Sequence, residues 1–147
     1  MVSAPLPDPA PSDPDRHELR RSGEGVALDE LGRIRSVVFL RWTEEVARAH
    51  AEAVGVGAAR MLAEKAIVVV RRHDLQLLRP AYRDDQLSVT TRVVSAQGLR
   101  AVRANRVVRV QTGELIATCL TVWVWINPET GRPQRPPREF MASYGFG

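Results

Sequence analysis

The strongest helical pattern in the chain lies between Asp29 and Val54. Apolar residues recur there at steps of three and four, the spacing that puts side chains on one face of a helix. Ser36 is a candidate N-cap, because its hydroxyl could accept from a free amide of the first turn. The stripe that we expect to be buried consists of Phe39, Trp42, Val46, Ala49 and Ala53. Such a helix suits the centre of a small domain around which a sheet can curl.

From Ala66 onward the pattern changes to that of β-strands. Residues with β-branched side chains dominate four segments, which Pro, Gly and polar turn residues separate. These segments are residues 66–78, 86–96, 99–110 and 113–126. The short connections predict antiparallel neighbours in a meander. We also expect a short strand within residues 17–28 and one or two helical turns within residues 58–66.

The alternation within two of these strands predicts their faces. Arg103, Asn105 and Arg109 share one face of residues 99–110, and we expect that face to meet water. Residues 113–126 are instead apolar on both faces. That pattern is typical of a strand inside a sheet, or of a sheet whose second face is covered by a partner chain.

The composition predicts one domain with a tail at each end. Five of the ten prolines fall among the first fourteen residues, so we expect residues 1–15 to form a disordered or loosely docked tail. Residues 16–137 form the domain, and the hydrophobic content of 44% over 147 residues is enough for a real core. Residues 138–147 are expected to form a C-terminal tail.

Charge and cysteine content limit the environment and the partners. No apolar run reaches the ~18 residues of a membrane span, and the first fifteen residues lack the pattern of a signal peptide, so we expect a cytoplasmic protein. The formal charge of +4 favours polyanionic partners but does not choose among nucleic acid, an acidic carrier protein and a phosphorylated ligand. The single cysteine, Cys119, is expected to be buried and inert.

Three stretches of the sequence, residues 29–42, 75–93 and 126–137, carry motifs that recur together in one family. The first has an acidic-to-aromatic signature, whose positions are Asp29, Gly32, Ile34, Phe39, Leu40, Arg41 and Trp42. In this order and spacing the three stretches resemble the 4-hydroxybenzoyl-CoA thioesterase family of hotdog proteins. The resemblance covers residues 26–137 and implies an α+β hotdog fold, in which a curved antiparallel sheet wraps a long central helix.

The resemblance also implies an activity and a set of site residues. It implies hydrolysis of an acyl thioester of coenzyme A or of an acyl carrier protein, at a site between two protomers of a homodimer or homotetramer. Asp29 would act as nucleophile or base, and the backbone amide near Ser36 would polarise the thioester carbonyl. Another branch uses a carboxylate of the helix, which makes Glu44 and Glu45 alternatives. Beyond the coenzyme A or phosphopantetheine of the substrate we expect no cofactor, no metal and no nucleic acid.

Four further residues are expected to bind the substrate. Phe39 and Trp42 stand beside the expected site, and Arg100 and Arg103 match a basic hairpin that holds the phosphates of coenzyme A in relatives. The alternative for the two arginines is a solvated face. A guanidinium suits phosphate because its fork donates two hydrogen bonds at once.

Plainer interpretations stay open for several candidates. Asp29 could serve only as a turn former, and His73 could be a base or an edge histidine, while His17 and His50 have no candidate partners in the sequence. Asp84 and Asp85 are typical of a turn. Ser36 and Val38 depart from the family pattern, so the alternative function is a non-catalytic hotdog protein that binds acyl thioesters or a partner. A dehydratase would need a His–acid motif that does not appear.

Overall fold

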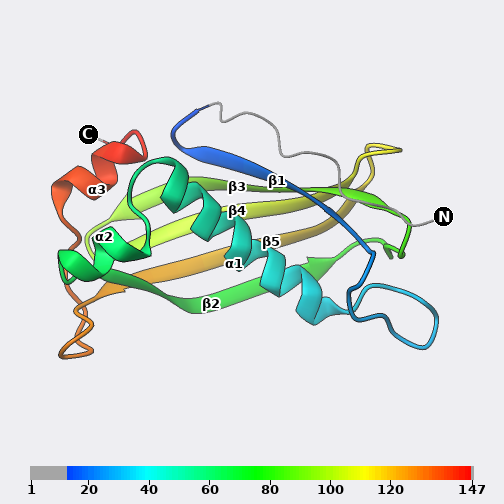
Figure 1. Cartoon of the computed structure of the whole chain (residues 1–147), viewed down its shortest axis with the longest axis horizontal. Coiled ribbons are helices and arrows are strands. Elements are labelled where there is room, and N and C mark those ends of the chain that lie inside the picture. The colour runs from blue at the N-terminus through cyan, green and yellow to red at the C-terminus, as the bar shows by residue number, and fades with distance from the viewer. Residues whose placement is uncertain (1–12, 147) are drawn as a thin grey trace.

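The computed structural model describes residues 13–146, which form five strands and three helices (Figure 1). The strands are β1 Arg16–Ser22, β2 Ile67–Leu77, β3 Gln86–Gln97, β4 Arg100–Arg109 and β5 Leu115–Ile126. The helices are α1 Ser36–Ala53, α2 Ala58–Ala63 and α3 Arg138–Ser143. All four predicted strands after Ala66, the short strand before the helix and the short helix α2 are therefore confirmed.

The five strands form one antiparallel sheet in the order β1-β3-β4-β5-β2. Strands β3, β4 and β5 are consecutive neighbours, which confirms the predicted meander for these three strands. Strand β2 does not join its neighbour in sequence, β3, but pairs with β5 at the other edge. The doubly apolar strand β5 lies between β4 and β2, inside the sheet, as its sequence predicted. Strands β1 and β2 are the two edges. One antiparallel sheet packed against a long helix is the predicted α+β hotdog fold, with the short strand β1 preceding the helix.

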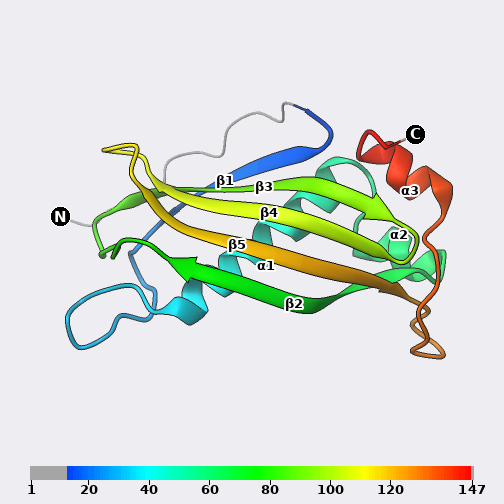
Figure 2. The same ribbon diagram turned by 180° about the vertical axis from the view of Figure 1, so that it is seen from behind.

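Helix α1 lies across one face of the sheet, and Figure 2 shows the opposite face without a helix in front of it. Phe39, Trp42 and Val46 are buried against the sheet, which confirms most of the predicted stripe. The end of the stripe differs: Ala53 is exposed, and the helix instead buries His50 and Ala51. Ala53 is the last residue of the helix, so the buried row ends one turn earlier than the stripe predicted.

Helix α1 begins later than the full extent of the predicted stretch. Its N-cap residue is Arg35, with extended backbone and no side-chain cap, so Ser36 is the first helical residue and not the cap. Residues 29–35 form a loop that leads into the helix. The predicted cap was wrong because Ser36 already has helical backbone geometry and no cap hydrogen bond from a side chain is present.

The prediction for the faces of β4 was wrong. Arg103 and Asn105 point to the helix side and are buried, 6% and 2% exposed. Both side chains find internal partners: Asn105 donates to the Cys119 carbonyl and to the Thr121 hydroxyl. Polar residues can therefore occupy an inward face when hydrogen bonds compensate for their burial, which alternation alone does not reveal.

Both ends of the described chain pack on the domain. The Asp15 carbonyl accepts from the Val93 amide, so the described part of the expected N-terminal tail, residues 13–15, is docked; residues 1–12 lie outside the described residues. Residues 138–147 were expected to form a tail, but they contain α3 and bury Phe140 and Tyr144. Within residues 13–146, no helix is long and apolar enough to cross a membrane.

Candidate functional site

Asp29 shapes the loop that enters α1. One carboxylate oxygen accepts from the Leu31 and Arg33 amides, both at 2.9 Å, and the other accepts from the Arg33 side chain at 2.7 Å. The Arg33 amide contributes most to holding the pKa of Asp29 below its ordinary value, so this carboxylate stays ionised at neutral pH. Gly32 has a φ of 78°, which an L side chain rarely adopts. Asp29 therefore has the turn-forming role that the sequence analysis left open as an alternative.

Asp29 and Ser36 also line one cavity of about 440 Å³, here called the Asp29 cavity. Its walls come from the loop, from the first turn of α1 and from the residues after β2. They include Phe39, Leu77, Leu78, Arg79, Pro80 and Ala81. The first turn of α1 contains no acidic residue and no side-chain cap. The positive end of the helix dipole is thus free to act on a ligand there.

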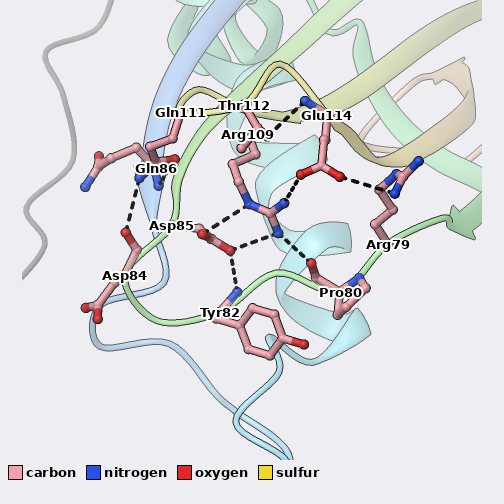
Figure 3. Close-up of polar contacts among 10 residues, drawn as sticks. All are labelled: Arg79, Pro80, Tyr82, Asp84, Asp85, Gln86, Arg109, Gln111, Thr112 and Glu114. Atoms are coloured by element: carbon pink, nitrogen blue, oxygen red, sulfur yellow. Dashed lines mark hydrogen bonds and ion pairs between the residues drawn. The ribbon is translucent and has the colours of Figure 1, made fainter.

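An ion-pair cluster of Arg109, Asp85 and Glu114, which we call the Arg109 clamp, holds the chain at Pro80 (Figure 3). Arg109 donates to Glu114 at 2.6 Å, to the Pro80 carbonyl at 2.8 Å and to Asp85 at 3.2 Å. Asp85 also accepts from the Tyr82 amide at 2.7 Å, which confirms turn chemistry for this residue. Because Pro80 lines the Asp29 cavity, the clamp sets the position of that part of the cavity wall.

A second hollow, here called the Arg103 groove, lies between α1 and β2, and residues of α2 and α3 also line it. Its volume is about 500 Å³. The walls are mainly small or apolar side chains, with Arg103 and Tyr144 among them; the others include Ala47, Ala51, Ala101, Val68, Trp123 and Trp125. Glu44, Arg48 and Glu52 also line it. No pattern in the sequence indicates this groove, because its residues come from seven separate elements.

Of the two helix carboxylates, Glu44 and not Glu45 faces possible catalytic partners. Glu45 pairs with Arg21 of β1 at 3.2 Å and lines neither hollow, which argues against the predicted alternative. Glu44 lines the Arg103 groove, and its carboxylate lies 3.6 Å from Nε2 of His73. That distance exceeds a hydrogen bond, and the buried Nε2 has no hydrogen-bond partner in the part of the chain described.

The other nitrogen of His73 faces a polar cluster on β5. Nδ1 lies 2.9 Å from the Thr121 hydroxyl and 3.7 Å from the Cys119 sulfur. Burial raises the pKa of the Cys119 thiol, and its side chain is 2% exposed. The prediction of a buried cysteine is confirmed, and a thiol in this state is a poor nucleophile.

The four predicted substrate-binding residues lie in different places in the structure. Phe39 lines the Asp29 cavity, whereas Trp42 is enclosed in the core and reaches neither hollow. Arg100 is exposed, but Arg103 is buried on the helix side, so the predicted joint phosphate site is wrong. The two residues are three apart on one strand, and side chains at that spacing point to opposite faces. Among residues 13–146, no cluster of ligating side chains could hold a metal ion.

Comparison with solved structures identifies the class of this fold. The chain is 14% identical to the 1,4-dihydroxy-2-naphthoyl-CoA thioesterase from Synechocystis, covering 88% of this chain and 96% of that one, with a TM-score of 0.80. It is 24% identical to an acyl-ACP thioesterase from Bacteroides thetaiotaomicron, covering 83% and 50%, with a TM-score of 0.76. It is 20% identical to the 12:0-ACP thioesterase from Umbellularia californica, covering 88% and 49%, with a TM-score of 0.77.

These similarities confirm the hotdog fold. The enzyme class, that of thioesterases, follows from a family model. A model of the acyl-ACP thioesterase N-terminal domain family matches residues 26–144, and the chain belongs to this family. It spans about half the length of the two acyl-ACP thioesterases. No curated protein matches it by sequence.

Proposed function

We propose that the chain hydrolyses its acyl thioester in the Asp29 cavity, with Asp29 and the Ser36 amide as the reacting groups. The observation that carries this proposal is that both residues line the same cavity at the start of α1. A carboxylate beside the positive end of a helix stays ionised, and an amide at that end can stabilise an oxyanion. Hydrolysis in this form uses no metal and no redox cofactor.

The carboxylate of Asp29 keeps room for one reacting partner. An ionised carboxylate offers about four acceptor positions, and the Leu31 amide and the two groups of Arg33 occupy three. The fourth can accept a proton from water as that water attacks the thioester carbonyl; alternatively, the carboxylate itself attacks the carbonyl carbon. In either route the carbonyl oxygen becomes an oxyanion at the Ser36 amide, and the carbon–sulfur bond then breaks. In the base route the proton that Asp29 took from water passes to the departing thiolate, which leaves the free acid and the thiol. In the nucleophile route the acyl group remains on Asp29 as an anhydride, which water then cleaves; a proton of that water goes to the thiolate, and the Asp29 carboxylate is restored.

Basic residues at the cavity support a phosphorylated carrier. Arg33, Arg35 and Arg79 all line it, and both coenzyme A and phosphopantetheine carry phosphate. We propose that these arginines bind the phosphates of coenzyme A or of an acidic acyl carrier protein. We further propose a cytoplasmic enzyme, in keeping with the single cysteine in the sequence.

Replacing Asp29 by Asn tests the catalytic assignment. The variant keeps the shape of the turn but removes the charge, so kcat should fall by roughly 10²-fold or more, the usual scale for a positioned base. Thiol release from a panel of short, long and aromatic acyl thioesters measures the rate. Circular dichroism checks that the fold is retained.

Glu44→Gln is the matched control, because it removes a carboxylate of α1 that does not line the Asp29 cavity. It should retain activity. If Asp29→Asn hydrolyses the best substrate at the wild-type rate while Glu44→Gln is inactive, then Glu44 and His73 form the catalytic pair. An inactive wild type across the whole panel would support the non-catalytic alternative.

We propose that the site is completed by a second protomer in a homodimer or homotetramer. Leu77 and Leu78 line the Asp29 cavity and are 52% and 51% exposed, and a partner surface would cover them. Light scattering at micromolar concentration should give a dimer or tetramer, and Leu78→Arg should shift it toward monomer with loss of activity. A monomeric wild type that is fully active would contradict this assembly.

A further inference from the structure

Arg103 is a buried cation held by neutral groups only. Its guanidinium donates to Nδ1 of His50 at 2.9 Å, to the Thr91 hydroxyl at 3.3 Å and to the Tyr144 hydroxyl at 3.4 Å. Among residues 13–146, no carboxylate pairs with it. Burial lowers the pKa of Arg103, and Tyr144 only partly offsets that effect.

His50 cannot act as the missing counter-ion. Its Nε2–H donates to the Pro14 carbonyl at 2.7 Å, which leaves Nδ1 to accept from Arg103. This arrangement fixes the neutral form of the ring, and burial followed by the charge of Arg103 lowers the pKa of His50 to about 4. The phenol of Tyr144 is neutral as well, because burial raises its pKa.

Arg103 retains unused donors inside an apolar hollow. A guanidinium has five N–H donors, and the three hydrogen bonds in the described chain leave its Nε–H and one further N–H without an acceptor. The residue lines the Arg103 groove beside Trp123 and Trp125, whose buried indole N–H groups also lack acceptors within residues 13–146. Glu44 and Arg48 at this groove pair with each other at 3.4 Å.

The combination defines the chemistry of a ligand. An apolar chain would fill the groove between α1 and β2, and an oxygen anion would neutralise the buried charge and accept from its fork. An uncharged alkyl end would neither neutralise the charge of Arg103 nor accept hydrogen bonds from it. We propose that the Arg103 groove binds an apolar chain that ends in a carboxylate, with the carboxylate on Arg103.

Two sources could supply this ligand. The first source is hydrolysis of an acyl thioester, which releases a free acid, an apolar chain that ends in a carboxylate. The second source is a dicarboxylic acyl group, which carries a carboxylate at its far end while its other end is still joined to the thiol. The first source would make the groove a product site, and the second would make it an acyl-selecting site. The second rests on the proposed function, whereas binding of the free acid does not.

Direct binding provides the main test. Octanoate and octan-1-ol have the same chain and differ in charge, and quenching of Trp123 and Trp125 fluorescence reports binding in the groove. Wild-type protein should bind octanoate roughly 10- to 100-fold more tightly than octan-1-ol, the range expected for a buried charged hydrogen bond. Equal affinity for the two probes would overturn the proposal without reference to any variant or to catalysis.

Variants of β4 then test whether Arg103 supplies the charge that binds octanoate. Arg103→Met should lose the preference for octanoate and keep the affinity for octan-1-ol. Arg106→Met is the matched control, since it lies on the same strand but is exposed, and it should bind as wild type. Should Arg103→Met fail to fold, Arg103→Lys keeps the charge without the fork and should lose part of the preference. A folded Arg103→Met that still prefers octanoate would overturn the assignment.

Kinetics distinguish the two sources. If the groove selects the acyl group, wild type hydrolyses suberoyl-CoA at least tenfold faster than octanoyl-CoA, and Arg103→Met reverses that preference. If it binds only the product, the two thioesters react alike and octanoate inhibits wild type but not Arg103→Met. A wild type that hydrolyses neither thioester yet binds octanoate selectively would refute the proposed function and leave this inference intact.

Discussion

Two arginines of β4, Arg103 and Arg109, are both withdrawn from water but have opposite surroundings. Arg109 meets two carboxylates, Asp85 and Glu114, and a backbone carbonyl. Arg103 meets an imidazole and two hydroxyls. Burial disfavours the charge of each, but Asp85 and Glu114 outweigh it at Arg109 and raise its pKa, whereas the pKa of Arg103 falls.

The difference separates an arginine that holds the fold from one that is prepared for a ligand. A cation whose hydrogen bonds end on carboxylates is internally compensated, and it ties together the chain segments that carry those groups. A buried cation without a counter-ion carries an uncompensated desolvation cost, which natural proteins retain where a site requires it. The two ends of one strand thus serve different purposes.

Acid should weaken the Arg103 region more than the Arg109 clamp. The pKa of His50 is about 4 in the folded protein and 6.5 in the unfolded chain, so the unfolded chain binds more protons between these values. The stabilisation is fully present above pH 6.5 and is lost as the pH falls toward 4, by on the order of 3 kcal/mol. Urea unfolding at a series of pH values measures the slope.

The His50→Gln variant provides the comparison for that experiment. It removes the titrating ring, so between pH 6.5 and 4 its free energy of unfolding should fall less steeply than that of the wild type. Carboxylates whose pKa the fold lowers, such as Glu24 and Glu114, contribute to both profiles alike. A wild-type profile no steeper than that of His50→Gln would contradict the neutral, buried state of the imidazole.

Arg109→Met should destabilise the fold next most. It leaves Asp85 and Glu114 without their main partner, and these side chains are only partly exposed, 18% and 35%. We expect a loss of about 2 kcal/mol, below the cost of breaking a fully buried pair because water reaches the carboxylates. Chemical denaturation measures it. The double variant with Asp85→Asn should lose less than the sum of the two single changes.

Arg103→Met should cost the least, about 1 kcal/mol or below. It removes three hydrogen bonds, but it also removes a buried charge that no carboxylate compensates, and the two effects oppose each other. The same unfolding experiment gives the value. An Arg103→Met variant that is less stable than Arg109→Met would show that Arg103 is chiefly structural.

Local sequence patterns predicted most of the fold but not the difference between Arg103 and Arg109. The stripe around Phe39 and Trp42 and the β-branched segments depend on neighbours in sequence, so periodicity predicted them correctly. In the sequence, Arg103 and Arg109 look alike. Their difference depends on groups 41 and 24 residues away, Tyr144 and Asp85, which only the folded chain brings near.

The candidate site divides in the same way. The turn at Asp29 and the start of the helix are close in sequence, and the family resemblance implied a joint role for them; both line one cavity. The pairing of Glu44 with His73, the partners of His50 and the Arg103 groove each join residues from separate elements. The alternating pattern of β4 even pointed the wrong way, because a hydrogen-bonded polar side chain can face inward.

The two ends of the described chain meet at His50. The Pro14 carbonyl accepts from one side of the His50 ring, and Pro14 lies near Gly145, while Tyr144 lies edge-on to the same ring at a centroid distance of 4.9 Å. This proximity permits a different order of the same chain. A circular permutant that links residue 13 to residue 146 and opens at the exposed Gln97–Gly98 turn should fold with its sheet and both hollows unchanged.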